Sequence, residues 1–131
     1  LMKILNNNGN FYEVKWDKVV LWDEPEGLTC NDGTYSSYAG RADRDPHFFV
    51  THWDVALSAA SCAKIGKKRG LSVHFCIDND GTIYQLLDTQ HAAWQAGGRN
   101  WNHRSIGVEI SNAYYTKYQI IFLKITYREV E

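Results

Sequence analysis

The sequence of 131 residues predicts a single α/β (α+β) domain, a sandwich of strands and helices. Three observations lead to this prediction. An aromatic and β-branched run over 47–53 is typical of a strand, an alanine-rich segment after it is typical of a helix, and two alternating runs flank a turn at 78–81. Strand, helix, hairpin, loop and strand therefore follow one another, and no internal repeat interrupts them.

The first 46 residues carry weaker signals. Residues 6–10, rich in asparagine, predict a turn, and residues 15–22 could form a strand. Residues 23–46 contain three glycines and both prolines, which predicts a long surface loop. Loops of this length inside a compact domain often border a functional site.

The run over 47–53 predicts a buried strand, and a helix follows it. Asp54 or Ser58 could cap this helix, which we expect to run to about Arg69 and to end at Gly70. Small and apolar side chains would let it approach a sheet closely: Ala56, Leu57, Ala59, Ala60, Ala63 and Ile65.

The second half of the chain predicts a hairpin and one more strand. Residues 71–77 and 82–87 flank Asp-Asn-Asp-Gly, and Asp-Gly supplies the backbone angles that a tight turn needs. A polar loop over 97–103 should lead into a strand over 104–110. Residues 114–131 could be an edge strand or a short amphipathic helix.

Composition excludes several classes of protein. Lys and Arg number 14 against 15 Asp and Glu, a net charge of -1, which argues against nucleic acid as the main partner. No segment is long and apolar enough to insert in a membrane, and no signal peptide is visible. Three cysteines without paired spacing indicate a domain made in a reducing compartment and independent of disulfides.

The residues that could carry chemistry form no local motif. None of the five histidines lies in an HExxH arrangement, and the chain has neither a GxSxG elbow nor a P-loop. A cysteine nucleophile is possible but unattractive, because Cys62 and Cys76 fall in elements that we expect to be buried. Any metal site would have to be assembled from separate elements.

Three side chains on the predicted strands could be functional or structural. His52 closes a strand, where a histidine is more often structural than a ligand. We interpret His74 as a hydrogen-bonded core histidine. Glu109 stands between Val108 and Ile110, and burial of a carboxylate is costly unless it is paired or functional, so a general base and a structural salt bridge are equally good interpretations.

Together these segments resemble the zinc-dependent N-acetylmuramoyl-L-alanine amidases, the family of phage lysis amidases and peptidoglycan recognition proteins. The resemblance covers about residues 47–118 and rests on FFVTHW (48–53), LSVHFCIDNDGTIYQ (71–85), AWQAG (93–97) and RSIGVEI (104–110). It implies a mixed central β-sheet flanked by helices. It also implies two regions, a variable N-terminal extension over 1–46 and an amidase-like domain over 47–131 that is truncated or altered after about residue 119.

The resemblance implies a chemistry as well. His52 corresponds to a zinc ligand, and Glu109 to the base that activates water and passes its proton to the leaving amine. The bond cut would join the lactyl group of N-acetylmuramic acid to L-alanine. A tyrosine that some phage members use is replaced by Val73, which favours the glutamate branch. Substrate contacts are expected from the matching positions Trp53, His74, Trp94 and Asn112.

Two departures from the family bear on activity. Gln95 stands where family members usually have a histidine. After Glu109 the sequence contains no His, Cys or Asp, although the family takes its remaining zinc ligands from that part of the chain. His91 and His103 could be substitutes, but the family gives neither a ligand role, and an exposed loop histidine is the simpler interpretation.

The sequence thus predicts a zinc-dependent peptidoglycan amidase made in the cytoplasm for cell-wall lysis of phage or prophage type. The alternatives are a metal-free module that binds muropeptides in the same cleft, and a structural component with a vestigial groove. One expectation underlies the hydrolase prediction: the His52 imidazole and the Glu109 carboxylate should face a common cleft.

Overall fold

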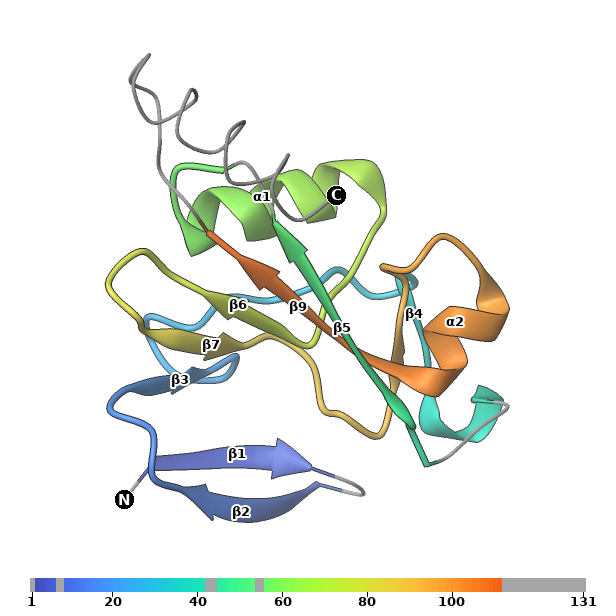
Figure 1. The fold of residues 1–131 in the computed structure, drawn as a ribbon, viewed down its shortest axis with the longest axis horizontal. Helices are drawn as coiled ribbons and strands as arrows, with labels where there is room; N and C mark the ends of the chain where they lie inside the picture. The colour runs from blue at the N-terminus through green and yellow to red at the C-terminus, as the bar shows by residue number, and fades with distance from the viewer. Residues whose placement is uncertain (1, 7–8, 42–44, 54–55, 112–131) are drawn as a thin grey trace, which may run out of the picture.

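The central feature of the fold is a mixed five-stranded sheet. A computed structural model describes residues 2–6, 9–41, 45–53 and 56–111 (Figure 1). Its strands lie in the order β3-β7-β6-β9-β5, with β6 and β7 antiparallel and all other neighbours parallel. They span β3 (Val19–Leu21), β5 (Phe48–Trp53), β6 (Phe75–Ile77), β7 (Ile83–Gln85) and β9 (Ser105–Ile110). The mixed central sheet with helices beside it confirms the predicted α+β class.

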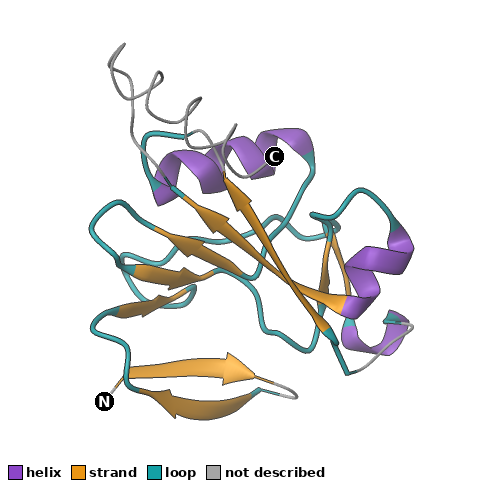
Figure 2. Cartoon of the chain, viewed as in Figure 1, coloured by secondary structure: helices purple, strands orange, loops and turns teal. Residues whose placement is uncertain are grey.

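Smaller elements complete the described part of the chain (Figure 2). They are the hairpin β1 (Met2–Asn6) and β2 (Asn10–Val14), the pair β4 (Tyr35–Ser36) and β8 (Ala92–Ala93), helices α1 (Ala59–Arg69) and α2 (Arg99–Arg104), and the 3₁₀ turn η1 (Tyr38–Gly40). Asn6 and Asn10, at the two ends of the predicted turn, are register partners in this hairpin. No helix in the described residues is long and apolar enough to cross a bilayer.

Helix α1 begins and ends where the sequence predicts. The Ser58 side chain accepts a hydrogen bond from the Ser61 amide, and Gly70 ends the helix with a positive φ of 68°. Ala59 and Ala63 are buried and pack with Cys76 in the core, so the small-residue face does approach the sheet. Leu57 and Ile65, which we placed on that face, are instead about half exposed.

The hairpin is also confirmed, with shorter strands than predicted. Asp78 donates its amide to the Thr82 carbonyl at 2.8 Å, and Gly81 adopts a φ of 87°. Glycine is needed here because other residues rarely tolerate that angle.

Two predictions about the site's surroundings are wrong. The strand predicted as buried is β5, which lies at the edge of the sheet and alternates between exposed and half-buried residues. The stretch predicted as a polar loop over 97–103 contains α2, whose N-cap residue Gly98 makes no side-chain hydrogen bond. Asn102 stabilises it by accepting the amides of Gln95 and Ala96, seven and six residues earlier in the chain, and no sequence motif indicates these contacts.

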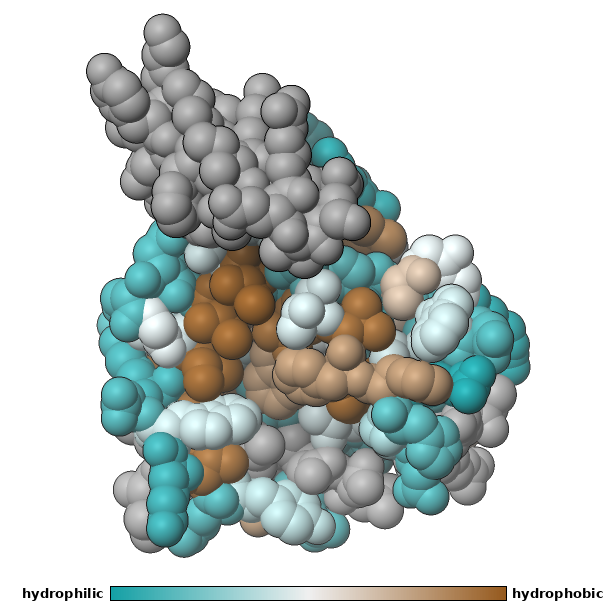
Figure 3. Space-filling view, viewed as in Figure 1, coloured by the Kyte–Doolittle hydropathy of each residue, from teal (hydrophilic) through white to brown (hydrophobic). Residues whose placement is uncertain are grey.

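One strand of the N-terminal region, β3, is built into the central sheet, whereas β1 and β2 form a sheet of their own. β3 pairs in parallel with β7 along its whole length. The long loop after β3 returns through Arg41, which is 3% exposed and donates hydrogen bonds to backbone carbonyls near β8, α2 and β9. In one space-filling view, hydrophobic side chains gather over the middle of the molecule and hydrophilic ones surround them (Figure 3). The predicted tail over 114–131 lies outside the described residues.

Candidate active site

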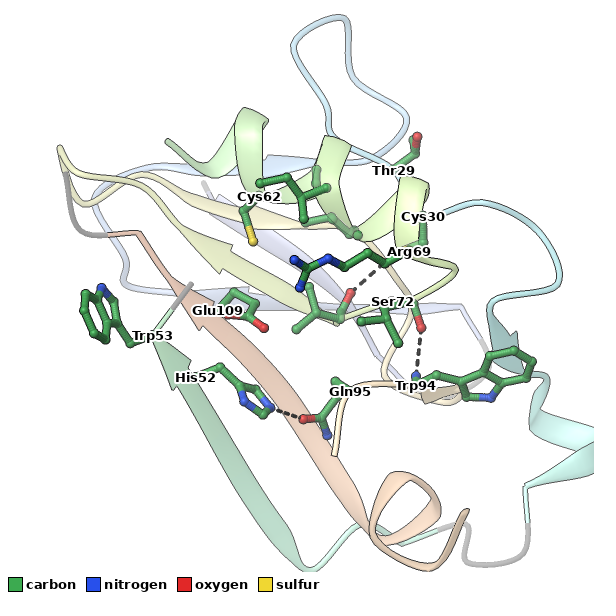
Figure 4. Close-up of a pocket in the computed structure, with 16 residues that line it drawn as sticks. Thr29, Cys30, His52, Trp53, Cys62, Arg69, Ser72, Trp94, Gln95 and Glu109 are labelled. Atoms are coloured by element: carbon green, nitrogen blue, oxygen red, sulfur yellow. Dashed lines mark hydrogen bonds between the residues drawn. The ribbon is translucent and has the colours of Figure 1, made fainter. Parts of the chain in front are cut away.

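A cleft of about 330 Å³ lies on the face of the sheet that α1 covers. Helix α1 forms one wall, β5 and β9 contribute the opposite side, and the loop after β8 closes one end (Figure 4). The residues that line it include His52, Trp53, Cys62, Arg69, Ser72, Trp94, Gln95 and Glu109. A volume of this size is within the range of small-molecule sites in proteins.

His52 and Glu109 face this cleft together. They are direct register partners in the parallel pair β5–β9, so their side chains leave the sheet on the same face. Both are half-buried and both line the cleft. The expectation of a common cleft is therefore met, while the roles of ligand and base stay predictions.

Gln95 connects His52 to the opposite end of β9. Its Oε1 is hydrogen-bonded to His52 Nε2, and its Nε2 donates to Ser105 Oγ at 2.8 Å. Gly107 lies beneath the Gln95 side chain, because a Cβ on Gly107 would come within 2.5 Å of Gln95 Cγ. The residue that replaces the family's histidine is therefore held firmly beside the predicted zinc ligand.

Three thiols lie beside the cleft, and the pKa values of two of them are raised. Cys30 and Cys62 line it, and Cys76, the register partner of Glu109, is buried beneath. A hydrogen bond with Cys62, followed by burial, raises the pKa of the Cys76 thiol well above its ordinary value. Burial is also the main cause that raises the pKa of Cys30. Both thiols stay protonated at neutral pH, which makes them poor nucleophiles.

The described side chains do not form a closed zinc site. Catalytic zinc takes three protein ligands, and no group of three His, Cys, Asp or Glu in the described ranges is arranged to hold a metal. His52 is the one predicted ligand, and its Nε2 is already hydrogen-bonded to Gln95. The donors in the described ranges therefore do not make up the three-ligand zinc site that the resemblance implies.

The predicted substrate-binding residues differ in their positions relative to the cleft. Trp53 and Trp94 line the cleft, and both are partly exposed. Asn112 lies outside the described residues. Arg69 also lines the cleft, and it is the only Lys or Arg among the described residues that do so. Sequence reasoning gave Arg69 no role, because its position at the end of a helix is equally typical of a solvated cation.

The structure gives no support to the prediction that His74 binds substrate. Its side chain is fully buried and lines no part of the cleft. His74 Nδ1 accepts the Gly107 amide at 3.0 Å, and its Nε2 donates to the His91 carbonyl at 2.8 Å. Burial is the main cause that lowers its pKa to about 4. His74 is the neutral core histidine that the residues alone indicate.

His91 and His103 lie away from the cleft. His91 Nδ1 accepts the Tyr38 amide, and His103 is buried with Nε2 at 3.3 Å from Ser36 Oγ. Burial lowers the pKa of both rings. His103 is 3% exposed, so our expectation of an exposed loop histidine at this position is wrong.

Comparison with known proteins identifies the relatives of this arrangement. The model of the family described as N-acetylmuramoyl-L-alanine amidase (Amidase_2) matches residues 42–124. This match includes β5, the hairpin and β9, and therefore both His52 and Glu109. No curated protein sequence matches the chain.

Solved structures give a second comparison. A selenomethionine derivative of AmpD is 26% identical, with 76% of this chain and 70% of that chain covered and a TM-score of 0.45. The hydrolase AmiA of Staphylococcus aureus, in complex with its ligand, is 17% identical, with 77% of this chain covered and a TM-score of 0.51. This chain spans 47% of the AmiA chain, and the likeness to AmiA concerns the fold alone.

Proposed function

This chain belongs to the N-acetylmuramoyl-L-alanine amidase family, and we propose that its cleft hydrolyses the amide between the lactyl group of N-acetylmuramic acid and L-alanine. The observation that carries the proposal is the register of β5 and β9. It places an imidazole and a carboxylate side by side at the wall of one cleft.

Glu109 is the general base in this proposal. Its carboxylate takes a proton from the attacking water, the water oxygen bonds to the amide carbon, and the proton then passes to the departing amine of L-alanine. The half-buried position of Glu109 supports this role, since water and substrate can reach it from the cleft.

Other lining residues suit a muropeptide. The partly exposed indoles of Trp53 and Trp94 offer apolar faces to a sugar ring or a peptide. The Arg69 guanidinium offers a fork-shaped donor to a carboxylate of the peptide. No step is assigned to zinc, because the described donors do not fit it. The phage or prophage setting stays a prediction.

Exchange of the carboxylate for an amide tests the proposal. Glu109→Gln should lower the rate of muramyl-peptide hydrolysis at least about 10²-fold, because a general base is lost while the shape of the side chain is kept. The rate is measured by chromatography of the released peptide, and circular dichroism checks that the variant is folded. Glu26→Gln, at an exposed position outside the cleft, is the matched control.

If the hydrolysis rate of Glu109→Gln stays within a few-fold of that of the unmodified chain, Glu109 is not the general base. A rate that falls equally in Glu26→Gln would show that the assay reports the loss of any carboxylate and not of a base.

A second candidate function is a metal-free module that binds muropeptides. The observation in its favour is the hydrogen bond between Gln95 and His52 Nε2, which occupies one ring nitrogen of the residue predicted as the zinc ligand. In this case the chain binds a muramyl dipeptide in calorimetry, with no hydrolysis and no zinc retained after purification. Binding accompanied by release of free peptide would instead favour the amidase.

A further inference from the structure

We propose that Phe48 and Trp101 form a second binding site, a platform for the sugar rings of a glycan chain that leads away from the cleft. This site rests on the proposed function for the chemical class of its ligand, a chain of peptidoglycan. The glycan would lie over the start of β5 and over α2, while the stem peptide occupies the cleft beside α1.

Phe48 and Trp101 form an exposed aromatic corner where the start of β5 lies beside α2 (Figure 1). Their ring centroids are 5.2 Å apart and their planes are inclined at 70°, so the edge of one ring meets the face of the other. Phe48 is 40% exposed and Trp101 is 47% exposed. Two rings that pack against each other and still leave this much surface to water offer flat apolar faces to a ligand.

Arg104 holds the aromatic corner in shape and adds polar groups to it. Its guanidinium carbon lies 5.1 Å from the centroid of the Phe48 ring and 6.0 Å from that of the Trp101 ring. These cation–π contacts restrict both rings, so the rings lose little conformational entropy when a ligand binds. A guanidinium also carries five N–H donors, which suit the hydroxyl and N-acetyl oxygens of a sugar. The corner thus combines apolar faces with donors, as a sugar ring combines apolar C–H groups with a polar rim.

The aromatic corner lies on the same face of the sheet as the cleft. Side chains alternate along a strand, so Phe48 leaves β5 on the same face as His52, four positions further on. The Gln95 side chain lies between them, above Gly107. It is hydrogen-bonded to His52 at one end and to Ser105, the register partner of Phe48, at the other. One continuous surface therefore runs from the cleft over Gln95 to the two rings.

The distance between the cleft and the corner fits a polymer and not a single sugar. A strand advances about 3.3 Å per residue, so Phe48 and His52 are about 13 Å apart along β5. A muramyl group whose lactyl amide lies beside His52 and Glu109 does not reach the rings, but the next sugars of a short glycan do. The open corner suits stacked sugar rings, whereas the walled cleft with Arg69 suits a peptide that carries carboxylates.

Chemical-shift titration with a glycan that lacks peptide tests this site without hydrolysis. The probe is a tetrasaccharide of alternating N-acetylglucosamine and N-acetylmuramic acid, added to ¹⁵N-labelled protein. We expect the indole N–H signal of Trp101 to shift and to saturate. The signal of Trp16, which packs on Phe75 outside the cleft, should stay unchanged. Muramyl dipeptide, whose single sugar is held at the cleft, should leave the Trp101 signal in place.

Exchange of one ring separates this site from a general affinity for sugars. Phe48→Thr, which keeps a good strand former, should weaken binding of the tetrasaccharide about 10-fold, as read from the Trp101 signal. Phe49→Thr is the matched control and should leave the affinity unchanged, because Phe49 is 66% exposed on the opposite face of the same strand. Trp101→Gln, with calorimetry as the readout, is the second variant if Phe48→Thr does not fold.

A Trp101 signal that does not move with the tetrasaccharide overturns the proposal, as does equal weakening of binding in Phe48→Thr and Phe49→Thr. A Trp101 signal that moves as far with muramyl dipeptide also contradicts it, because one sugar at the cleft does not reach the rings. Failure of the amidase proposal would be seen differently, as an unaffected hydrolysis rate in Glu109→Gln. The titration is independent of that rate, because the tetrasaccharide has no bond between sugar and peptide.

Discussion

His52 and His74 show at the scale of single residues that surroundings decide what an imidazole can do. Both rings belong to neighbouring parts of the sheet, but His52 opens into the cleft, whereas His74 is enclosed and bonded to backbone on both sides. The first is available to a ligand, and the second is a cross-link between β9 and the segment before β8.

The buried state of His74 predicts a loss of stability in acid. Burial holds its folded-state pKa at about 4, below the ordinary value of 6.5. Between these values the unfolded chain binds a proton that the folded chain does not, so the free energy of unfolding should fall as pH drops from 6.5 toward 4. The expected loss is on the order of 3 kcal/mol.

Urea unfolding at pH values across this window measures the loss, and ring chemical shifts report the pKa of His74 itself. His91 and His103 act in the same direction, because burial lowers their pKa values too. His47→Gln, at an exposed position, is the control for the loss of a histidine as such. A free energy of unfolding that is constant across the window would contradict the protonation state assigned to His74.

At this scale the sequence predicts which residues belong to the site better than it predicts the contacts that they make. The alternation of β5 places His52 on one face, and the resemblance selects Glu109. Their adjacency depends on the register between strands that are 57 positions apart, which no local pattern encodes. The position of Gln95 could be read from the sequence, but its bonds to His52 and Ser105 depend on how three separate segments meet.

At the scale of elements, α1 is the part that local chemistry determines best. Ser58, the alanines and Gly70 act within one or two turns of the chain, so their effects need no knowledge of the fold. α2 and the edge position of β5 were mispredicted because both depend on tertiary neighbours. The order of strands in the sheet lies beyond any sequence window, and no sequence motif marks Asn102 as the acceptor of the Gln95 and Ala96 amides.

Gly66 inside α1 and Gly70 at its C-terminal end should respond in opposite ways to the same substitution. Gly66 is inside the helix, and its added Cβ would meet the Leu71 carbonyl oxygen at an ordinary 3.6 Å. Gly66→Ala should therefore stabilise the protein by up to about 1 kcal/mol. Gly70 has a φ of 68°, so Gly70→Ala should destabilise it by about 1 kcal/mol.

Thermal or urea unfolding of the two variants checks both signs in one experiment, and each variant is the control of the other. Destabilisation by both would mean that Gly66 contributes something besides flexibility. Stabilisation by Gly70→Ala would mean that the helix does not end in the left-handed conformation.

At the scale of the whole molecule, distant segments of the chain combine into one sheet and one cleft. β3 joins the sheet beside β7, although more than 60 residues separate Val19 from its partner Ile83. The sequence indicates this strand only as a possibility, because the loop that follows it has no periodic pattern. Arg41 anchors that loop through its hydrogen bonds to backbone carbonyls. Nothing in the sequence distinguishes Arg41 from the other arginines.

Arg41 should therefore be among the most sensitive positions in the described chain. Its guanidinium donates to the carbonyls of Thr89, His91, His103 and Ser105 over 2.7–3.2 Å, and the side chain is 3% exposed. Arg41→Met keeps much of the volume but leaves these buried acceptors without a donor, so it should lower the free energy of unfolding by about 3 kcal/mol or more. Arg99→Met, exposed on α2, should change the free energy of unfolding by less than about 0.5 kcal/mol.

Urea unfolding measures the free energy of unfolding of both variants, and hydrogen exchange should show the loss of protection in Arg41→Met concentrated around β8 and α2. An Arg41→Met protein as stable as its Arg99→Met control would mean that the loop is held by its other contacts.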